Sequence, residues 1–180
     1  MTADEREERS RRLLLLLGPL HDPARAAARR LCRSNADGDD LFQDSVLRAY
    51  DRLHELKDEG RFRSWFFAIL LSAHRARHRR DFWRRLFALD DLKAEPGRPP
   101  EAEELDGAQR MALALGTLSA ESREAVVLFE IEGFFLEEIA ELQGASLSAI
   151  KSRLSRARAS LARHYAKDVL LPPLATEKTP

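Results

Sequence analysis

Residues 136 to 158 read LEEIAELQGASLSAIKSRLSRAR, and this stretch decides the fold. Apolar residues such as Ile139 and Ile150 recur at helical spacing on both sides of Gly144. A glycine adopts the left-handed backbone that a tight turn requires, and Ala140 is small where two helices must cross closely. The pattern therefore predicts a helix-turn-helix.

The second helix of this motif is basic. Ser146 is placed to cap it, and from Ser148 to Tyr165 it contains no acidic residue. Its basic residues are Lys151, Arg153, Arg156, Arg158 and Arg163. Such a helix can enter the major groove of DNA. A helical hairpin with a solvated basic face is the alternative, but the spacing of the small residues favours the DNA-binding motif.

A second basic segment runs from Arg61 to Arg85. It has eight arginines against one aspartate, a net charge of seven positive, and six aromatic residues lie between them. Phe62 and Phe66 are expected in the core. No packing pattern accounts for the arginine run from His74 to Arg80, which therefore predicts a DNA-facing surface.

The other long segments also repeat their apolar residues every three or four positions, and no stretch alternates as a strand would. The expected helices cover Ala24 to Cys32 after the cap Asp22, Leu41 to Leu56 after Asp37 or Asp39, and Phe62 to His78 or beyond. A further helix, capped by Ser119, runs through Ile131 and stops at Gly133. The predicted fold class is all-α.

Residues 90 to 106 interrupt this helical pattern. Seven acidic residues against two basic ones give a net charge of five negative, and three prolines forbid a continuous helix. The composition predicts an acidic flexible linker between two small helical domains. The expected division is 10–88 for the first domain, 89–107 for the linker, 108–166 for the second domain and 167–180 for a loosely held tail.

The whole chain of 180 residues has 30 basic and 30 acidic side chains, so its two basic patches are balanced elsewhere. The single cysteine, Cys32, excludes a disulfide framework and a multi-cysteine zinc site. The leucine run from Leu13 to Leu17 is too short for a signal peptide or a membrane span. These features predict a cytoplasmic protein without membrane insertion.

Enzyme chemistry finds little support in the sequence. His74 and His78 are spaced to share a metal ion, but a third ligand is lacking and neighbouring arginines would repel a cation. A glycine-rich phosphate loop and a nucleophile–base pair are both missing. We expect no catalytic residue, no metal, no cofactor and no small-molecule substrate.

Three motifs, in this order, resemble one family. Residues 37 to 50, DGDDLFQDSVLRAY, resemble the polymerase-binding helix of bacterial sigma factors of the extracytoplasmic-function (ECF) group in the sigma-70 family. Residues 62 to 69, FRSWFFAI, are similar to the promoter-opening segment that follows it. Residues 133 to 158 are similar to the helix-turn-helix of the fourth sigma domain. The resemblance covers nearly the whole chain apart from the linker and the two ends.

The resemblance implies a non-catalytic transcription initiation factor made of sigma domains 2 and 4. Its partners would be promoter DNA and core RNA polymerase, through the beta and beta-prime subunits, with an anti-sigma factor as a further candidate. The residues implied to face the polymerase clamp are Asp40, Gln43, Asp44, Leu47 and Arg48. The residues implied to bind and melt the downstream (−10) element are Arg63, Ser72, Arg75, Arg77, His78, Arg79 and Arg80. The residues implied to recognise the upstream (−35) element are Ser148, Ala149, Lys151, Ser152, Ser155 and Arg156.

The chain departs from the family pattern at four places. Leu71-Ser72 stands where the family usually has arginine-asparagine, and Ala76 stands where an aspartate is common. These changes leave the base preference at the downstream element open. Phe135 replaces a usual serine cap, so Glu137 and Glu138 or packing must secure that helix. Gln143 replaces a usual apolar residue.

Two other functions remain open on the residues alone. A stand-alone helix-turn-helix regulator would bind duplex DNA without polymerase. A pure interaction protein would use its basic faces on an acidic partner. Likewise, Asp39, Asp40 and Asp44 form either an acidic face for a protein partner or a solvated one.

Overall fold

The computed structural model describes residues 2–87 and 107–166, and side chains within 2–80, 107 and 109–165. Every regular element in these ranges is helical, which confirms the all-α prediction. The first lobe consists of α1 (Ala3–Leu17), η1 (Gly18–Leu20), α2 (His21–Leu31), α3 (Asn35–Arg52), η2 (Leu53–Glu55), η3 (Glu59–Arg61) and α4 (Phe62–Phe87). The second lobe consists of α5 (Gly107–Gly116), α6 (Ala120–Val126), the π-helical η5 (Val127–Ile131), α7 (Leu136–Gln143) and α8 (Leu147–Ala166).

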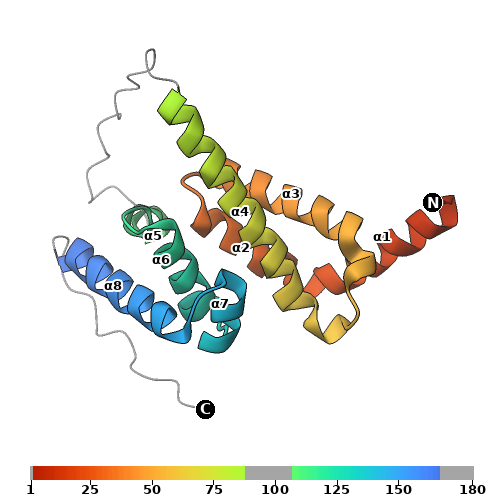
Figure 1. Ribbon diagram of the computed structural model, residues 1–180. Helices are drawn as coiled ribbons and strands as arrows, with labels where there is room; N and C mark the ends of the chain where they lie inside the picture. The colour runs from red at the N-terminus through yellow and green to blue at the C-terminus, as the bar shows by residue number, and fades with distance from the viewer. Residues whose placement is uncertain (1, 88–106, 167–180) are drawn as a thin grey trace.

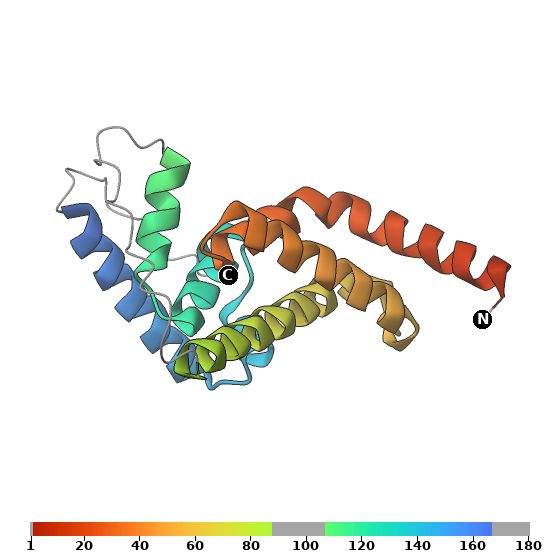
Figure 2. The same cartoon turned by 90° about the horizontal axis from the view of Figure 1, so that it is seen from above.

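The two lobes lie side by side (Figures 1 and 2). Helix α1 projects away from the second lobe, whereas α2 and α4 face it. The predicted tail and all of the predicted linker except Gly107, which begins α5, lie outside the described residues, so the proposed domain boundaries remain predictions.

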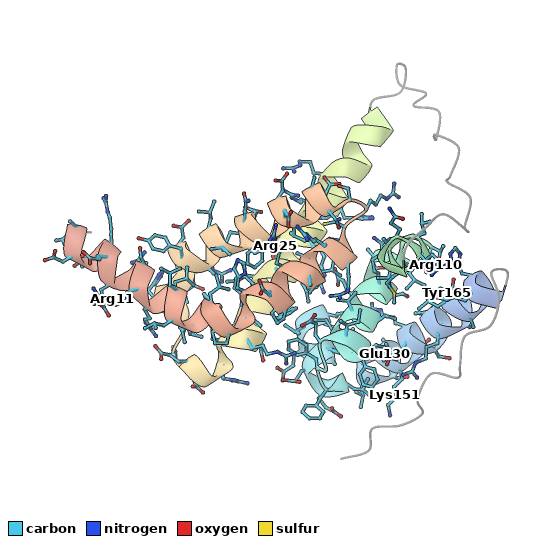
Figure 3. All side chains as sticks on the ribbon, turned by 180° about the vertical axis from the view of Figure 1, so that it is seen from behind. Arg11, Arg25, Arg110, Glu130, Lys151 and Tyr165 are labelled. Carbon is cyan, nitrogen blue, oxygen red and sulfur yellow. The ribbon has the colours of Figure 1, made fainter. Side chains whose placement is uncertain are left out.

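Helices α2 and α3 cross at a glycine. A Cβ atom added to Gly38 would lie 2.4 Å from the Cα atom of Arg29, so only glycine permits this approach. One residue further along, Asp39 accepts hydrogen bonds from Arg25 and Arg29 on α2. Figure 3 shows Arg25 beside these two helices. The close approach of Gly38 to the Arg29 backbone and the ion pairs of Asp39 together fix the angle between α2 and α3.

Helix α4 supplies the centre of the molecule because apolar side chains occupy almost its whole first half. Phe66, Phe67, Leu70 and Leu71 are all fully buried. Phe66 contacts Phe42 of α3, while Phe67 points to the second lobe and meets Phe134 edge-to-face at 5.0 Å. The predicted extension of this helix beyond residue 78 is confirmed.

Caps and turns of the second lobe follow the sequence signals. The Ser119 hydroxyl accepts a hydrogen bond from the Ser122 N–H, which confirms the cap of α6. Gly133, with φ of 70°, follows η5. Gly144, with φ of 58°, makes the turn between α7 and α8. The Ser146 hydroxyl accepts from the Ala149 N–H and caps α8, as predicted.

Two predicted N-caps in the first lobe are wrong. Ser34 caps α3, because its hydroxyl accepts the Asp37 N–H at 3.1 Å and starts the helix earlier than expected. Asp37 and Asp39 consequently lie inside α3. Asp22 does not cap α2, since η1 runs into α2 with helical backbone at Leu20 and the helix begins at residue 21.

The lobes also share their interior. One continuous cluster of buried apolar side chains includes residues from both, among them Leu31 and Phe67 on one side and Leu128 and Phe134 on the other. The two predicted helical domains therefore pack against each other, which the sequence pattern did not predict. None of the described helices is long and apolar enough to cross a membrane.

Candidate nucleic-acid interface

The helix-turn-helix presents a basic surface at the start of α8. Ser148, Lys151, Ser152, Ser155 and Arg156 are exposed, and Figure 3 shows Lys151 at the surface near the start of α8. The sixth predicted residue, Ala149, is half-buried. All six lie within the first three turns of α8, the part of a recognition helix that reaches base edges.

The two helices of the motif, α7 and α8, pack against each other through buried apolar side chains. These are Ile139 on α7 and Ile150 and Leu154 on α8. Lacking a side-chain cap at Phe135, α7 uses the Glu138 carboxylate, which accepts the Phe135 N–H at 2.8 Å. The sequence predicted that either Glu137 and Glu138 or packing would secure this helix, and Glu138 does so through this hydrogen bond. These contacts hold α7 and α8 as a rigid pair and leave the polar face of α8 exposed to solvent.

The predicted polymerase-binding residues form one stripe along α3. Asp40, Gln43, Leu47 and Arg48 are exposed, while Asp44 is half-buried and pairs with Arg48 at 3.1 Å. Leu47 is 66% exposed, so the stripe presents an apolar side chain among its polar and charged ones.

Asp39 does not belong to this stripe. Hydrogen bonds from Arg29 and Arg25 lower the pKa of its carboxyl well below the ordinary value, so it is a stable anion between two guanidinium groups. Its place in an acidic face for a partner was an open alternative, and the structure excludes it.

The predicted downstream-element residues fall into two groups. Ser72, His78, Arg79 and Arg80 are exposed on α4. Arg63, Arg75 and Arg77 instead contact the protein itself.

Each of these three arginines has a partner far along the chain. Arg63 Nη2 donates to the Glu132 carbonyl, and Arg77 Nη1 donates to the Asp37 carbonyl at 3.0 Å. Arg75 donates to the Glu124 carboxylate at 2.8 Å. The prediction that packing does not account for the arginine run from His74 to Arg80 is therefore wrong at Arg75 and Arg77.

Glu124 of α6 was missed by sequence reasoning, although it is the most buried charged group described. It is fully buried and accepts hydrogen bonds from Arg75, and His74 Nδ1 lies 2.9 Å from its Oε1. Burial raises the pKa of the Glu124 carboxyl, but the hydrogen bonds from His74 and Arg75 outweigh it and leave the pKa below the ordinary value. The available signal was a glutamate placed directly before an apolar run, Glu124 before Ala125-Val126-Val127-Leu128.

Arg123 is the second buried charged residue that sequence reasoning missed. Its guanidinium is buried and donates to carbonyl oxygens at the end of α5, at Leu115 and Gly116. It also donates to the Leu31 carbonyl, the last residue of α2 in the other lobe, at 2.9 Å. One side chain thus satisfies carbonyls at the ends of two helices.

Within the described side chains, no group of three histidine, cysteine or acidic residues is placed to hold a metal ion. His74, one of the two histidines weighed as a metal ligand, faces Glu124 instead.

Comparison with known proteins gives the same family for both lobes. Residues 16–86 match the family model "Sigma-70 region 2", and residues 108–161 match "Sigma-70, region 4". The chain is 32% identical to the ECF RNA polymerase sigma factor SigM of Mycobacterium tuberculosis over 143 residues, 79% of this chain and 71% of that protein. It is 34% identical to the sigma factor CnrH of Cupriavidus metallidurans over 146 residues, 75% of this chain and 76% of that protein.

Solved structures agree. The sigma factor RpoE of Bartonella quintana, in complex with the anti-sigma factor NepR, matches with a TM-score of 0.68 and 29% identity over 91% of this chain and 99% of that one. CnrH in complex with the cytosolic domain of CnrY matches with a TM-score of 0.65 and 29% identity over 93% and 96%. With both sigma regions in order and relatives matched over most of their length, the chain belongs to the ECF sigma factors of the sigma-70 family, the subunits that direct RNA polymerase to promoters.

Proposed function

We propose that this sigma factor docks on core RNA polymerase through the α3 stripe, recognises the −35 element through α8 and melts the −10 element through α4. The observation that carries the proposal is the exposed, acid-free first half of α8, held rigidly on α7 by buried Ile139 and Ile150. A helix of this shape and charge fits the major groove.

The α3 stripe supports the polymerase contact. It combines the exposed Leu47 with the charged Asp40, Asp44 and Arg48, a mixture that suits a protein surface better than nucleic acid. The exposed Arg79 and Arg80 at the far end of the described α4 side chains support contact with a DNA strand. An anti-sigma factor is a further proposed partner, because two similar solved sigma factors are bound by one.

The proposal is tested by run-off transcription with purified core polymerase and a promoter library. The wild type should select a promoter and support transcription. Asp40→Lys with Asp44→Lys should abolish both transcription and co-purification with core polymerase. The matched control is Glu7→Lys with Glu8→Lys, the same charge change on the exposed face of α1, which should leave both intact.

The α8 assignment is tested separately. Arg156→Ala should weaken promoter binding by the polymerase complex by about 1–3 kcal/mol if Arg156 reads a guanine, with relaxed preference at one base. A uniform loss across sequences with a shallower salt dependence would instead indicate a phosphate contact. Unchanged binding would remove Arg156 from the interface.

The same reagents distinguish a sigma factor from a stand-alone regulator. Such a protein binds duplex promoter tightly without polymerase in a mobility-shift assay, whereas a sigma factor requires the core enzyme for specific binding.

A further inference from the structure

The two lobes are joined by a buried carboxylate. Glu124 on α6 has a side chain that is 1% exposed, and it meets His74 at 2.9 Å and Arg75 at 2.8 Å. Both partners are on α4, in the other lobe. A buried charge is tolerated only while its partners are present, and Glu124 has these partners only when the lobes are together, so this contact is specific to the closed arrangement.

Hydrogen bonds continue from this carboxylate to the recognition helix. Gln143 Nε2 donates to Glu124 Oε2 at 3.2 Å, and the Gln143 side-chain oxygen accepts from Arg153 on α8. Arg75 also donates to the Leu142 carbonyl at 3.2 Å. Gln143, which departs from the family's apolar residue, thus has a definite role here. We call the group His74, Arg75, Glu124 and Gln143 the clasp.

Arg63 makes a second contact between the lobes. Its guanidinium lies 3.8 Å from the centre of the Phe134 ring and donates to the Glu132 carbonyl. Phe67, also on α4, packs edge-to-face on the same ring. Two of the arginines assigned to promoter DNA are therefore occupied by the second lobe.

We propose that the clasp holds the protein in a closed, autoinhibited state in which Glu124 occupies the place of a DNA phosphate on α4. This inference rests on the proposed function, because that function assigns Arg63 and Arg75 to the downstream element. A guanidinium whose donors are directed at Glu124 and a backbone carbonyl is not free to bind DNA. The lobes must separate before Arg63 and Arg75 can bind the downstream element, so the apparent affinity for promoter DNA is reduced in proportion to the fraction of open protein.

Cys32 provides a built-in reporter of this opening. It is the single cysteine of the chain and lines a cavity of about 450 Å³ together with residues of both lobes, such as His74 and Leu118. Burial raises the pKa of its thiol to about 11. Since the thiolate is the reactive form, alkylation at neutral pH is slow in the closed state and faster once the lobes part.

The experiment compares two opened variants with one control. Glu124→Gln removes the charge of the clasp, and Phe134→Leu removes the ring that Arg63 and Phe67 contact. The control Glu130→Gln removes a carboxylate whose partner, Arg158, is in the same lobe. Rates of Cys32 alkylation by iodoacetamide and promoter-specific transcription over a range of protein concentrations are measured for each, with circular dichroism as the check of folding.

Both opened variants should alkylate faster than the wild type, by about tenfold or more. They should also reach half-maximal transcription at a several-fold lower protein concentration, with an unchanged plateau, since the open state is no longer rare. Glu130→Gln should match the wild type in both measurements.

Wild-type alkylation rates in both folded variants would overturn the proposal. Faster alkylation without any gain in transcription, in a protein whose wild type transcribes, would overturn it as well. If the wild type itself gave no promoter-specific transcription, the proposed function would fail and the autoinhibition with it, while the alkylation rates would still show whether the clasp closes the lobes.

Discussion

Two neighbouring aspartates show how much a single position decides. Asp39 is directed at α2 and held by Arg25 and Arg29, with 27% of its side chain exposed. Asp40, one residue later, faces solvent on the proposed polymerase stripe. A rotation of 100° per helical residue separates an internal ion pair from a docking surface.

We therefore expect opposite phenotypes from the same chemical change. Asp39→Asn should lower the melting temperature, because it leaves two guanidinium groups facing a neutral amide. Asp40→Asn should leave the melting temperature unchanged and weaken co-purification with core polymerase. Thermal unfolding and a pull-down assay measure the two effects. Equal melting temperatures for both variants would contradict the assignment.

The Asp39 effect should depend on pH. In the unfolded chain an aspartate has a pKa of about 3.9, and the two arginines hold the folded-state pKa of Asp39 below that. The stabilisation is therefore present above about pH 4 and is lost as the pH falls further. The difference in melting temperature between the wild type and Asp39→Asn should shrink over the same acidic range.

At the level of helices, the crossing of α2 and α3 depends on Gly38. Alanine at an ordinary helical position is more favourable than glycine by about 1 kcal/mol. At Gly38 the added Cβ would overlap the backbone of Arg29, and backbone cannot turn aside as a side chain can. Overpacking of this kind costs about 1–3 kcal/mol, so the clash outweighs the propensity.

Gly38→Ala should consequently destabilise the protein by up to about 2 kcal/mol in urea unfolding, which is the overpacking cost less the gain in helix propensity. Gly116→Ala is the control, because a Cβ there meets nothing within 4 Å. That variant should be neutral or slightly stabilising. A stabilising Gly38→Ala would mean that the two helices can move apart freely.

For the whole molecule, the connection between the lobes is the dominant feature. Apolar side chains of α2 and α4 continue into those of α6 and η5, and Arg123 joins helix ends from both lobes. Burial lowers the pKa of the Arg123 guanidinium, which stays charged because its ordinary value is so high. The closed arrangement is therefore a cooperative packing and not a loose encounter.

Arg123→Lys should destabilise the protein by about 2–4 kcal/mol, because a lysine cannot reach the same set of carbonyl oxygens and leaves some of them buried without a donor. Urea unfolding followed by circular dichroism measures the loss. Arg158→Lys is the matched control, since its pair with Glu130 lies at the surface, with the two side chains 45% and 32% exposed, and should contribute less than about 1 kcal/mol. Equal losses in the two variants would contradict the role of Arg123.

Local sequence determined the elements and their ends at several places. The turn at Gly144, the caps at Ser119 and Ser146 and the apolar face of α4 all follow from interactions within a few residues, which periodicity and residue type express directly. The helix-turn-helix was predictable for the same reason. The failed caps at Asp37 and Asp22 show the limit. Ser34, Asp37 and Asp39 compete for one helix start, and at Asp22 the preceding η1 runs directly into α2.

Only the tertiary structure decided which charges face solvent. Arg75 and Arg79 look alike in a run of arginines, yet Arg75 is bound to Glu124, 49 residues away, and Arg79 is exposed. The partner of a long side chain depends on which helices pack together, and local periodicity carries no information about that. The sequence alone thus determined a pair of helical sigma regions with basic surfaces. The contact of one region with the other, through a shared apolar interior, Arg123 and the buried Glu124, came from packing between distant segments.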